Sequence, residues 1–129
     1  MTLPLPTEQA EQQAFIHWLE LQGLKYTAIP NETGHTTEAY RRATRMKRNG
    51  VRKGFPDLIV LVPPERSRDG LGYFLAIELK RQKGGVVSPE QREWIDAIND
   101  LNSPTMQAGV CKGLEEAIVL VTSYMKGTV

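Results

Sequence analysis

The chain has 129 residues, of which 40% are hydrophobic and 24% charged, and its formal net charge is +1. A chain of this length can bury one hydrophobic core, so we expect a single domain over residues 1–129. The single cysteine, Cys111, excludes an internal disulfide and a multi-cysteine zinc site. No apolar run approaches the ~20 residues that a membrane span needs. With no secretion signal at the N-terminus, the expected location is the cytoplasm, without a membrane partner.

The first half of the chain predicts two helices and a strand between them. Residues 8–22 have helical apolar spacing, with Thr7 as a plausible N-cap and Gly23 as the stop. Residues 24–29 alternate between apolar and polar, which favours a strand. A second helix is expected from Thr36 or Thr37 to Asn49, because Gly50 can end it in a left-handed conformation.

The second half predicts a hairpin followed by helix, strand and helix. Two apolar runs, 57–62 and 72–80, are joined by a polar loop and suit antiparallel strands. The next helix begins at Ser88, whose spacing to Gln91 forms a capping box. Its apolar face would carry Trp94, Ile95, Ile98 and Leu101. A strand at about 106–111 and a helix at about 114–126, burying Ala117, Ile118, Val121 and Met125, complete the chain. The order α-β-α-β-β-α-β-α indicates an α/β sandwich with a mixed central sheet flanked by helices.

Basic residues are concentrated in one short stretch of this almost neutral chain. Seven of them, with no acidic residue among them, lie between positions 41 and 53: Arg41, Arg42, Arg45, Lys47, Arg48, Arg52 and Lys53. Such a stripe favours contact with the phosphates of a nucleic acid. The alternative, a solvated helix face with no partner, is equally compatible with the pattern alone.

Charged residues at the ends of the two hairpin strands are the main candidates for chemistry. Because side chains alternate along a strand, Glu78 and Lys80 share one face. Burying these charges beside a sheet core costs free energy unless they are paired or bind a metal. Asp57 opens the neighbouring strand and can supply a second carboxylate for a hard divalent cation, with the backbone carbonyl of Leu79 as a third oxygen. Lys80 could then orient a water molecule or stabilise developing charge. An ordinary ion pair at a sheet edge is the alternative.

The spacing of these residues resembles the PD-(D/E)xK nuclease signature, with Pro56-Asp57 followed by Glu78-Leu79-Lys80. The longer segments 54–60, 77–80 and 88–94 are similar to the VRR-NUC branch, the virus-type replication-repair nucleases. This resemblance covers nearly the whole chain. It implies a restriction-endonuclease-like sandwich and a stand-alone domain of phage or prophage type, acting in the cytoplasm of the phage host or bacterium.

The resemblance also implies two further site residues. Related nucleases carry an acidic residue on the first helix, and Glu11 fits because Phe15, Trp18 and Leu19 follow it at inward-facing spacing. Glu8 remains a rival one turn earlier. The additional glutamine of the family corresponds to Gln91, which can also serve only as the third residue of the capping box.

Together these observations predict a Mg²⁺- or Mn²⁺-dependent DNA endonuclease with no organic cofactor. Glu11, Asp57 and Glu78 would hold the metal, while Lys83 and His35 would add to the DNA contacts of the basic stretch. By resemblance, the expected substrate is branched DNA, and the expected enzyme is a homodimeric Holliday-junction resolvase. The alternatives are a flap- or end-directed nuclease acting as a monomer and a DNA-binding module without catalysis.

Overall fold

The computed structural model describes residues 3–30 and 36–127 and has the predicted order of elements. These elements are α1 (Glu8–Gln22), β1 (Lys25–Ala28), α2 (Thr37–Arg48), β2 (Leu58–Val62), the 3₁₀ turn η1 (Pro64–Arg66), β3 (Tyr73–Lys80), α3 (Pro89–Asn99), β4 (Met106–Lys112) and α4 (Leu114–Thr122). No helix in these described ranges is long and apolar enough to cross a membrane.

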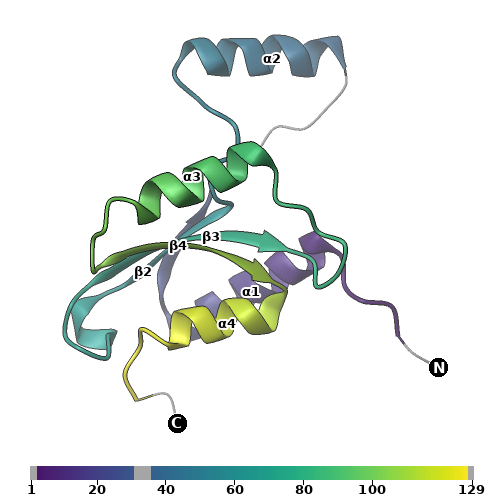
Figure 1. Ribbon diagram of the computed structural model, residues 1–129. Helices are drawn as coiled ribbons and strands as arrows, with labels where there is room; N and C mark the ends of the chain where they lie inside the picture. The colour runs from purple at the N-terminus through teal and green to yellow at the C-terminus, as the bar shows by residue number, and fades with distance from the viewer. Residues whose placement is uncertain (1–2, 31–35, 128–129) are drawn as a thin grey trace.

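The sheet is mixed, as predicted, with strand order β1-β2-β3-β4. The pairs β1–β2 and β2–β3 are antiparallel, whereas β3–β4 is parallel. Helices α1 and α4 cover one face and α3 covers the other (Figure 1). The alternation of β3 explains this division, because Leu75, Ile77 and Leu79 enter the larger core cluster with α1 and α4. Ala76 enters a smaller cluster with Ile95 of α3, so the odd and even positions of β3 serve different layers.

The helix boundaries near the sheet are set by the predicted caps. The Thr7 hydroxyl accepts a hydrogen bond from the backbone N–H of Ala10 at 3.1 Å, and α1 ends at Gly23 with φ of 69°. At the start of α3, Ser88 and Gln91 form the full capping box with Pro89 in the first turn. These caps matter for function because they fix the positions at which α1 and α3 begin beside the ends of β2 and β3.

Two predictions about the helices were wrong. Helix α3 ends at Asn99, and the chain turns so that Asn102 has a φ of 56°. Leu101 therefore leaves the apolar face and is 64% exposed instead of buried. Helix α4 ends at Thr122, not at 126. Met125 is still buried, because a bridge to Ser67 rather than a helical turn holds it against the core.

Helix α2 differs from the other helices because it stands clear of the sheet (Figure 1). It begins with Thr36 as N-cap, and none of its residues is buried. Tyr40 is 61% exposed. An isolated helix of this length is marginal in water, so its capping and its connection to the body at residues 49–56 are needed to hold it in place.

Candidate active site

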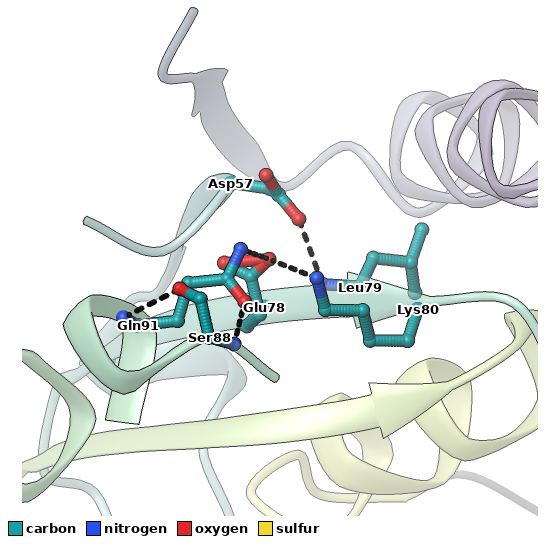
Figure 2. Close-up of polar contacts among 6 residues, drawn as sticks. All are labelled: Asp57, Glu78, Leu79, Lys80, Ser88 and Gln91. Carbon is teal, nitrogen blue, oxygen red and sulfur yellow. Dashed lines mark hydrogen bonds and ion pairs between the residues drawn. The ribbon is translucent and has the colours of Figure 1, made fainter. Parts of the chain in front are cut away.

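The geometry of β2 and β3 places Asp57 opposite Glu78. Leu58 pairs with Ile77 in the antiparallel ladder, so the residue before Leu58 falls across from the residue after Ile77. The Asp57 Oδ2 atom accepts a hydrogen bond from the Leu79 N–H at 3.0 Å. The Asp57 carbonyl accepts another from the Ile29 N–H at 2.7 Å. The Asp57 side chain thus extends the ladder just before β2 begins, and its carboxylate is held beside Glu78 (Figure 2).

Glu78 is almost completely buried, with 1% of its surface exposed. Its Oε2 atom accepts a hydrogen bond from the Gln91 side-chain N–H at 3.1 Å and lies 3.6 Å from the Lys80 ammonium nitrogen. Within the described residues its other oxygen, Oε1, has no hydrogen-bond partner. A buried, unpaired carboxylate oxygen is costly, so this atom is the feature of the cluster that an additional ligand would satisfy.

Gln91 makes both the helix-cap contact and a contact with Glu78. Its Oε1 atom accepts the Ser88 N–H at 2.9 Å, as the capping box requires. Because that contact uses the amide oxygen, the amide nitrogen must point the other way, toward Glu78. The helix cap therefore orients the group that holds one oxygen of the buried carboxylate (Figure 2).

Burial, followed by the hydrogen bond and the charge of the neighbouring Asp57 carboxyl, raises the pKa of Glu78 to about 8. Lys80 acts in the opposite direction, and Glu8 makes a smaller contribution that also raises the pKa. Two acceptor groups placed this closely need a positive charge or a proton between them. Glu78 therefore holds its proton to a higher pH than an ordinary glutamate does.

A cleft of about 590 Å³ leads to this cluster from the start of α1. It is lined by Glu8, Gln12, Ala28, Ile29, Pro30, Asp57 and Gln91. A larger cavity of about 790 Å³ lies along β4 and α4, and its lining does not include Asp57, Glu78, Lys80 or Gln91. Solvent and substrate can thus reach Asp57 beside the N-terminus of α1.

The donors present fit a hard divalent cation bound by few protein ligands. Asp57 and Glu78 provide carboxylate oxygens, one of them without a partner, and Mg²⁺ and Mn²⁺ prefer such oxygen ligands. Across the described ranges, no three His, Cys, Asp or Glu side chains gather at one point that could hold a metal. A cation here would keep several positions for water or phosphate. The backbone carbonyl of Leu79 remains a predicted third ligand.

Glu11, the predicted acidic residue of the first helix, is not brought to this cluster. It is 2% exposed; one carboxylate oxygen accepts the Leu114 N–H at the start of α4. The other accepts the Gln82 side-chain N–H at 2.8 Å. Glu11 does face the protein interior, as its helical spacing predicted. Its carboxylate, however, contacts Gln82 and the start of α4 instead of Asp57. Glu8, the rival, lines the cleft and acts on the pKa of Glu78.

Comparison with known proteins identifies the family. The VRR-NUC domain model matches residues 6–115. The chain belongs to the VRR-NUC family. A solved structure described as a VRR_NUC domain protein matches with a TM-score of 0.71 and 26% sequence identity, covering 96% of this chain and 92% of the other. A search of curated proteins found no match. The fold resemblance inferred from the sequence is confirmed, and the chain is a nuclease, a hydrolase acting on DNA.

The basic residues of this VRR-NUC domain lie mainly on the projecting helix. Five of the seven belong to α2: Arg41, Arg42, Arg45, Lys47 and Arg48. Arg52 turns back and donates to the Lys47 carbonyl at 3.0 Å, which leaves it at the end of the same helix. Lys53 lies 3.1 Å from Glu90 on α3. Lys83 lines the cavity along β4 and α4, away from the cleft at Asp57. His35 lies outside the described residues.

Two features of the VRR-NUC site were not predicted from the pattern. The Leu79 N–H anchors Asp57, whereas the sequence pattern points only to the Leu79 carbonyl. The cleft is also lined by Gln12 and by the turn at 28–30. The alternation of β3 does not reveal either contact. Both depend on where β2 begins relative to β3 and where α1 crosses the sheet.

The two acidic residues of α1 can be separated by substitution. Glu8→Gln should leave the free energy of unfolding almost unchanged and lower the DNA cleavage rate about tenfold, because Glu8 faces the cleft. Glu11→Gln should instead cost about 1–3 kcal/mol of stability, since its amide cannot accept both hydrogen bonds. Urea unfolding and cleavage rates per folded molecule measure both effects. A stable Glu11→Gln variant that has lost cleavage would restore Glu11 as the site residue.

The raised pKa of Glu78 predicts a pH-dependent stability in metal-free protein. Between the ordinary value of 4.5 and the folded-state value of about 8, the folded chain holds a proton that the unfolded chain has released. The free energy of unfolding should therefore fall as the pH rises through this window, by on the order of a few kcal/mol. Urea unfolding in EDTA should show this decline in the wild type and a much flatter profile in Glu78→Gln. Equal declines in both proteins would assign the effect to other groups.

Proposed function

We propose that this VRR-NUC chain is a Mg²⁺- or Mn²⁺-dependent structure-specific DNA endonuclease. The observation that carries the proposal is the unpaired, buried Glu78 Oε1 beside the Asp57 carboxylate. Buried polar atoms without a partner are rare in folded proteins, and carboxyl groups with a raised pKa cluster at functional sites. A divalent cation held by Asp57 and Glu78 would satisfy this atom and would supply Lewis-acid chemistry for phosphodiester hydrolysis.

The surrounding residues have separate roles in this proposal. Asp57 and Glu78 hold the cation, and the Leu79 N–H keeps Asp57 in position. Gln91 fixes the orientation of the Glu78 carboxylate through Oε2. Lys80, which is 7% exposed, supplies a positive charge close to the place where phosphate negative charge develops. Glu8, in the open cleft, is placed to accept a proton from an attacking water.

The basic face of α2 supports binding to the DNA backbone. Helix positions 41, 45 and 48 follow one another at intervals of four and three residues, so Arg41, Arg45 and Arg48 share one side. The side chains Ala39, Ala43 and Met46 are on the other side. A helix that projects with one basic side can follow phosphates without reading base edges. Specificity would then come from the shape of the DNA.

Within this activity, we propose a branched substrate cut by a homodimer. A four-way junction needs two symmetric cuts, and two copies related by a two-fold axis provide two equivalent sites. The support for this finer statement is the resemblance to stand-alone members of the VRR-NUC branch and the presence of one catalytic cluster in the described chain. A monomeric flap- or end-directed nuclease is the competing outcome of the test below.

The test is cleavage of end-labelled DNA substrates of identical sequence: a four-way junction, a 5′ flap and a plain duplex. With Mg²⁺ or Mn²⁺, the wild type should make paired symmetric cuts in the junction, and EDTA should abolish them. Asp57→Asn and Glu78→Gln should lower the rate by roughly 10³-fold or more, and Lys80→Ala by about 10²–10³-fold. Asp96→Asn is the matched control, because this exposed carboxylate on α3 makes only a weak ion pair with Arg92.

The competing outcomes are distinct. Cutting only the flap would indicate the monomeric flap- or end-directed nuclease. DNA binding without cutting in either metal would indicate a binding module in which the two carboxylates are structural. Full cleavage by Glu78→Gln would remove Glu78 from the catalytic role.

The α2 basic face makes a further prediction for binding. The double variant Arg41→Ala/Arg45→Ala should weaken junction binding in EDTA and reduce the slope of log K against log salt by about 2, since each lost phosphate contact removes about 0.9 from it. Lys25→Ala/Lys126→Ala removes the same charge from exposed sites on β1 and beyond α4 and should leave the slope unchanged. Equal effects of the two pairs would mean that net charge, not α2, drives binding.

A further inference from the structure

The segment Lys53–Phe55 leaves the α2 connection and leads directly to Asp57. It lies against the first turns of α3, where Trp94 makes two contacts with it. The Trp94 Nε1–H donates to the Lys53 carbonyl at 3.2 Å. The Phe55 ring meets the Trp94 ring in an edge arrangement, with centroids 5.2 Å apart and an interplanar angle of 72°. Aromatic pairs of this geometry are favourable beyond their buried area.

Gly54, in the middle of this segment, packs closely against the backbone of α3. Gly54 has a φ of +97°, and a Cβ there would lie 2.7 Å from the Glu90 carbonyl carbon. Only glycine permits both the conformation and the contact. The ion pair of Lys53 with Glu90 also joins the two elements, but Lys53 is 81% exposed and the pair adds little. The close fit and the Trp94 contacts therefore hold the segment.

This packing is connected to Asp57 on one side and to Gln91, which holds Glu78, on the other. Phe55 is separated from Asp57 only by Pro56, which is buried and has a restricted backbone. On the other side, Trp94 follows Gln91 by three residues and lies about one helical turn along α3. Trp94 thus ties the strand end that carries Asp57 to the helical turn that carries Gln91.

We propose that Trp94 is a positioning residue for the nuclease site. By holding Phe55 and the Lys53 carbonyl on α3, it sets where the Asp57 carboxylate lies relative to Glu78, and so the spacing of the two metal-binding groups. This inference rests on the proposed function for its catalytic meaning. The structural part, that Trp94 governs the placement of Asp57, is independent of cleavage. A purely structural Trp94 would contribute stability without affecting Asp57 in particular.

The direct test measures amide hydrogen exchange by NMR in full-length, metal-free protein. The Leu79 N–H is protected through its bond to Asp57, so its exchange reports the position of that carboxylate. The Ile77 N–H, in the same strand, is the internal reference for global stability. In Trp94→Ala, Leu79 exchange should accelerate about tenfold or more relative to Ile77. In Trp94→Phe, which retains a ring against Phe55 but lacks the indole donor, the acceleration should be smaller.

Trp18→Ala is the matched control. Trp18 stacks on Phe15 at 6.0 Å in α1, so its loss removes a comparable aromatic pair from the other sheet face. In Trp18→Ala, the exchange rates of the Leu79 and Ile77 amides should rise together, with their ratio unchanged. An unchanged ratio in Trp94→Ala as well would overturn the proposed role.

Cleavage provides a second readout. Trp94→Ala should lower kcat about 10–100-fold and raise the Mg²⁺ concentration for half-maximal rate, with KM for DNA nearly unchanged, and Trp94→Phe should recover most of kcat. Trp18→Ala should retain wild-type kcat per folded molecule. If the wild type fails to cleave, the proposed function is wrong, while the exchange ratio still decides the role of Trp94. Normal Mg²⁺ dependence and kcat in Trp94→Ala would overturn its catalytic positioning role.

Discussion

The organisation of this domain depends on a buried carboxylate held beside a second one at the end of two antiparallel strands. Glu78 has almost no exposure to water, and Asp57 faces it at the point where β2 begins. Taking an ionised carboxylate out of water costs several kcal/mol, and placing another beside it adds repulsion. The chain tolerates this arrangement because protons, hydrogen-bond donors or a cation can compensate the negative charge. The compensating groups come from β3 itself and from α3.

The compensating groups come from structural devices that are ordinary by themselves. The Lys80 ammonium follows from strand alternation, and it lies near Glu78 because both point to the α3 face. The Gln91 amide is directed by a helix cap. The Leu79 N–H is available to the Asp57 side chain because it lies beyond the residues of β3 that pair with β2. One Glu78 oxygen remains without a partner within the described chain. In this account, the fold satisfies every contact except the one that the metal would make.

The main elements and the Asp57–Glu78 pairing could be predicted because they follow from short-range patterns. The capping box at Ser88, the stop at Gly23 and the alternation around Glu78 are local signals, and each corresponds to the observed structure. The placement of Glu11 could not be predicted in the same way. Helical spacing identifies it as inward-facing, but two different structures lie inward of α1: the cleft at Asp57 near its start and the first turn of α4. Only the packing of α1 against α4 shows that Glu11 caps the latter.

Long-range contacts explain the other differences as well. Leu101 is exposed, not buried as predicted, because the chain turns after Asn99. Met125 is buried as predicted, because a bridge to the distant residue Ser67 holds it against the core. Likewise, Gly54 and Trp94 are forty residues apart, and the close approach of their segments to each other emerges only in the folded chain. Sequence patterns thus identify the chemical groups, while the crossing of elements decides which of them meet.

The central claim, that Asp57 and Glu78 share one cation, is tested most directly by a crystal structure of the chain grown or soaked with Mn²⁺. Anomalous scattering would locate the metal without reference to activity. The account predicts one strong peak within coordination distance of an Asp57 oxygen and of Glu78 Oε1, and no peak at this position in Glu78→Gln. A peak bound elsewhere, with the Glu78 oxygen still unoccupied at saturating Mn²⁺, would contradict it.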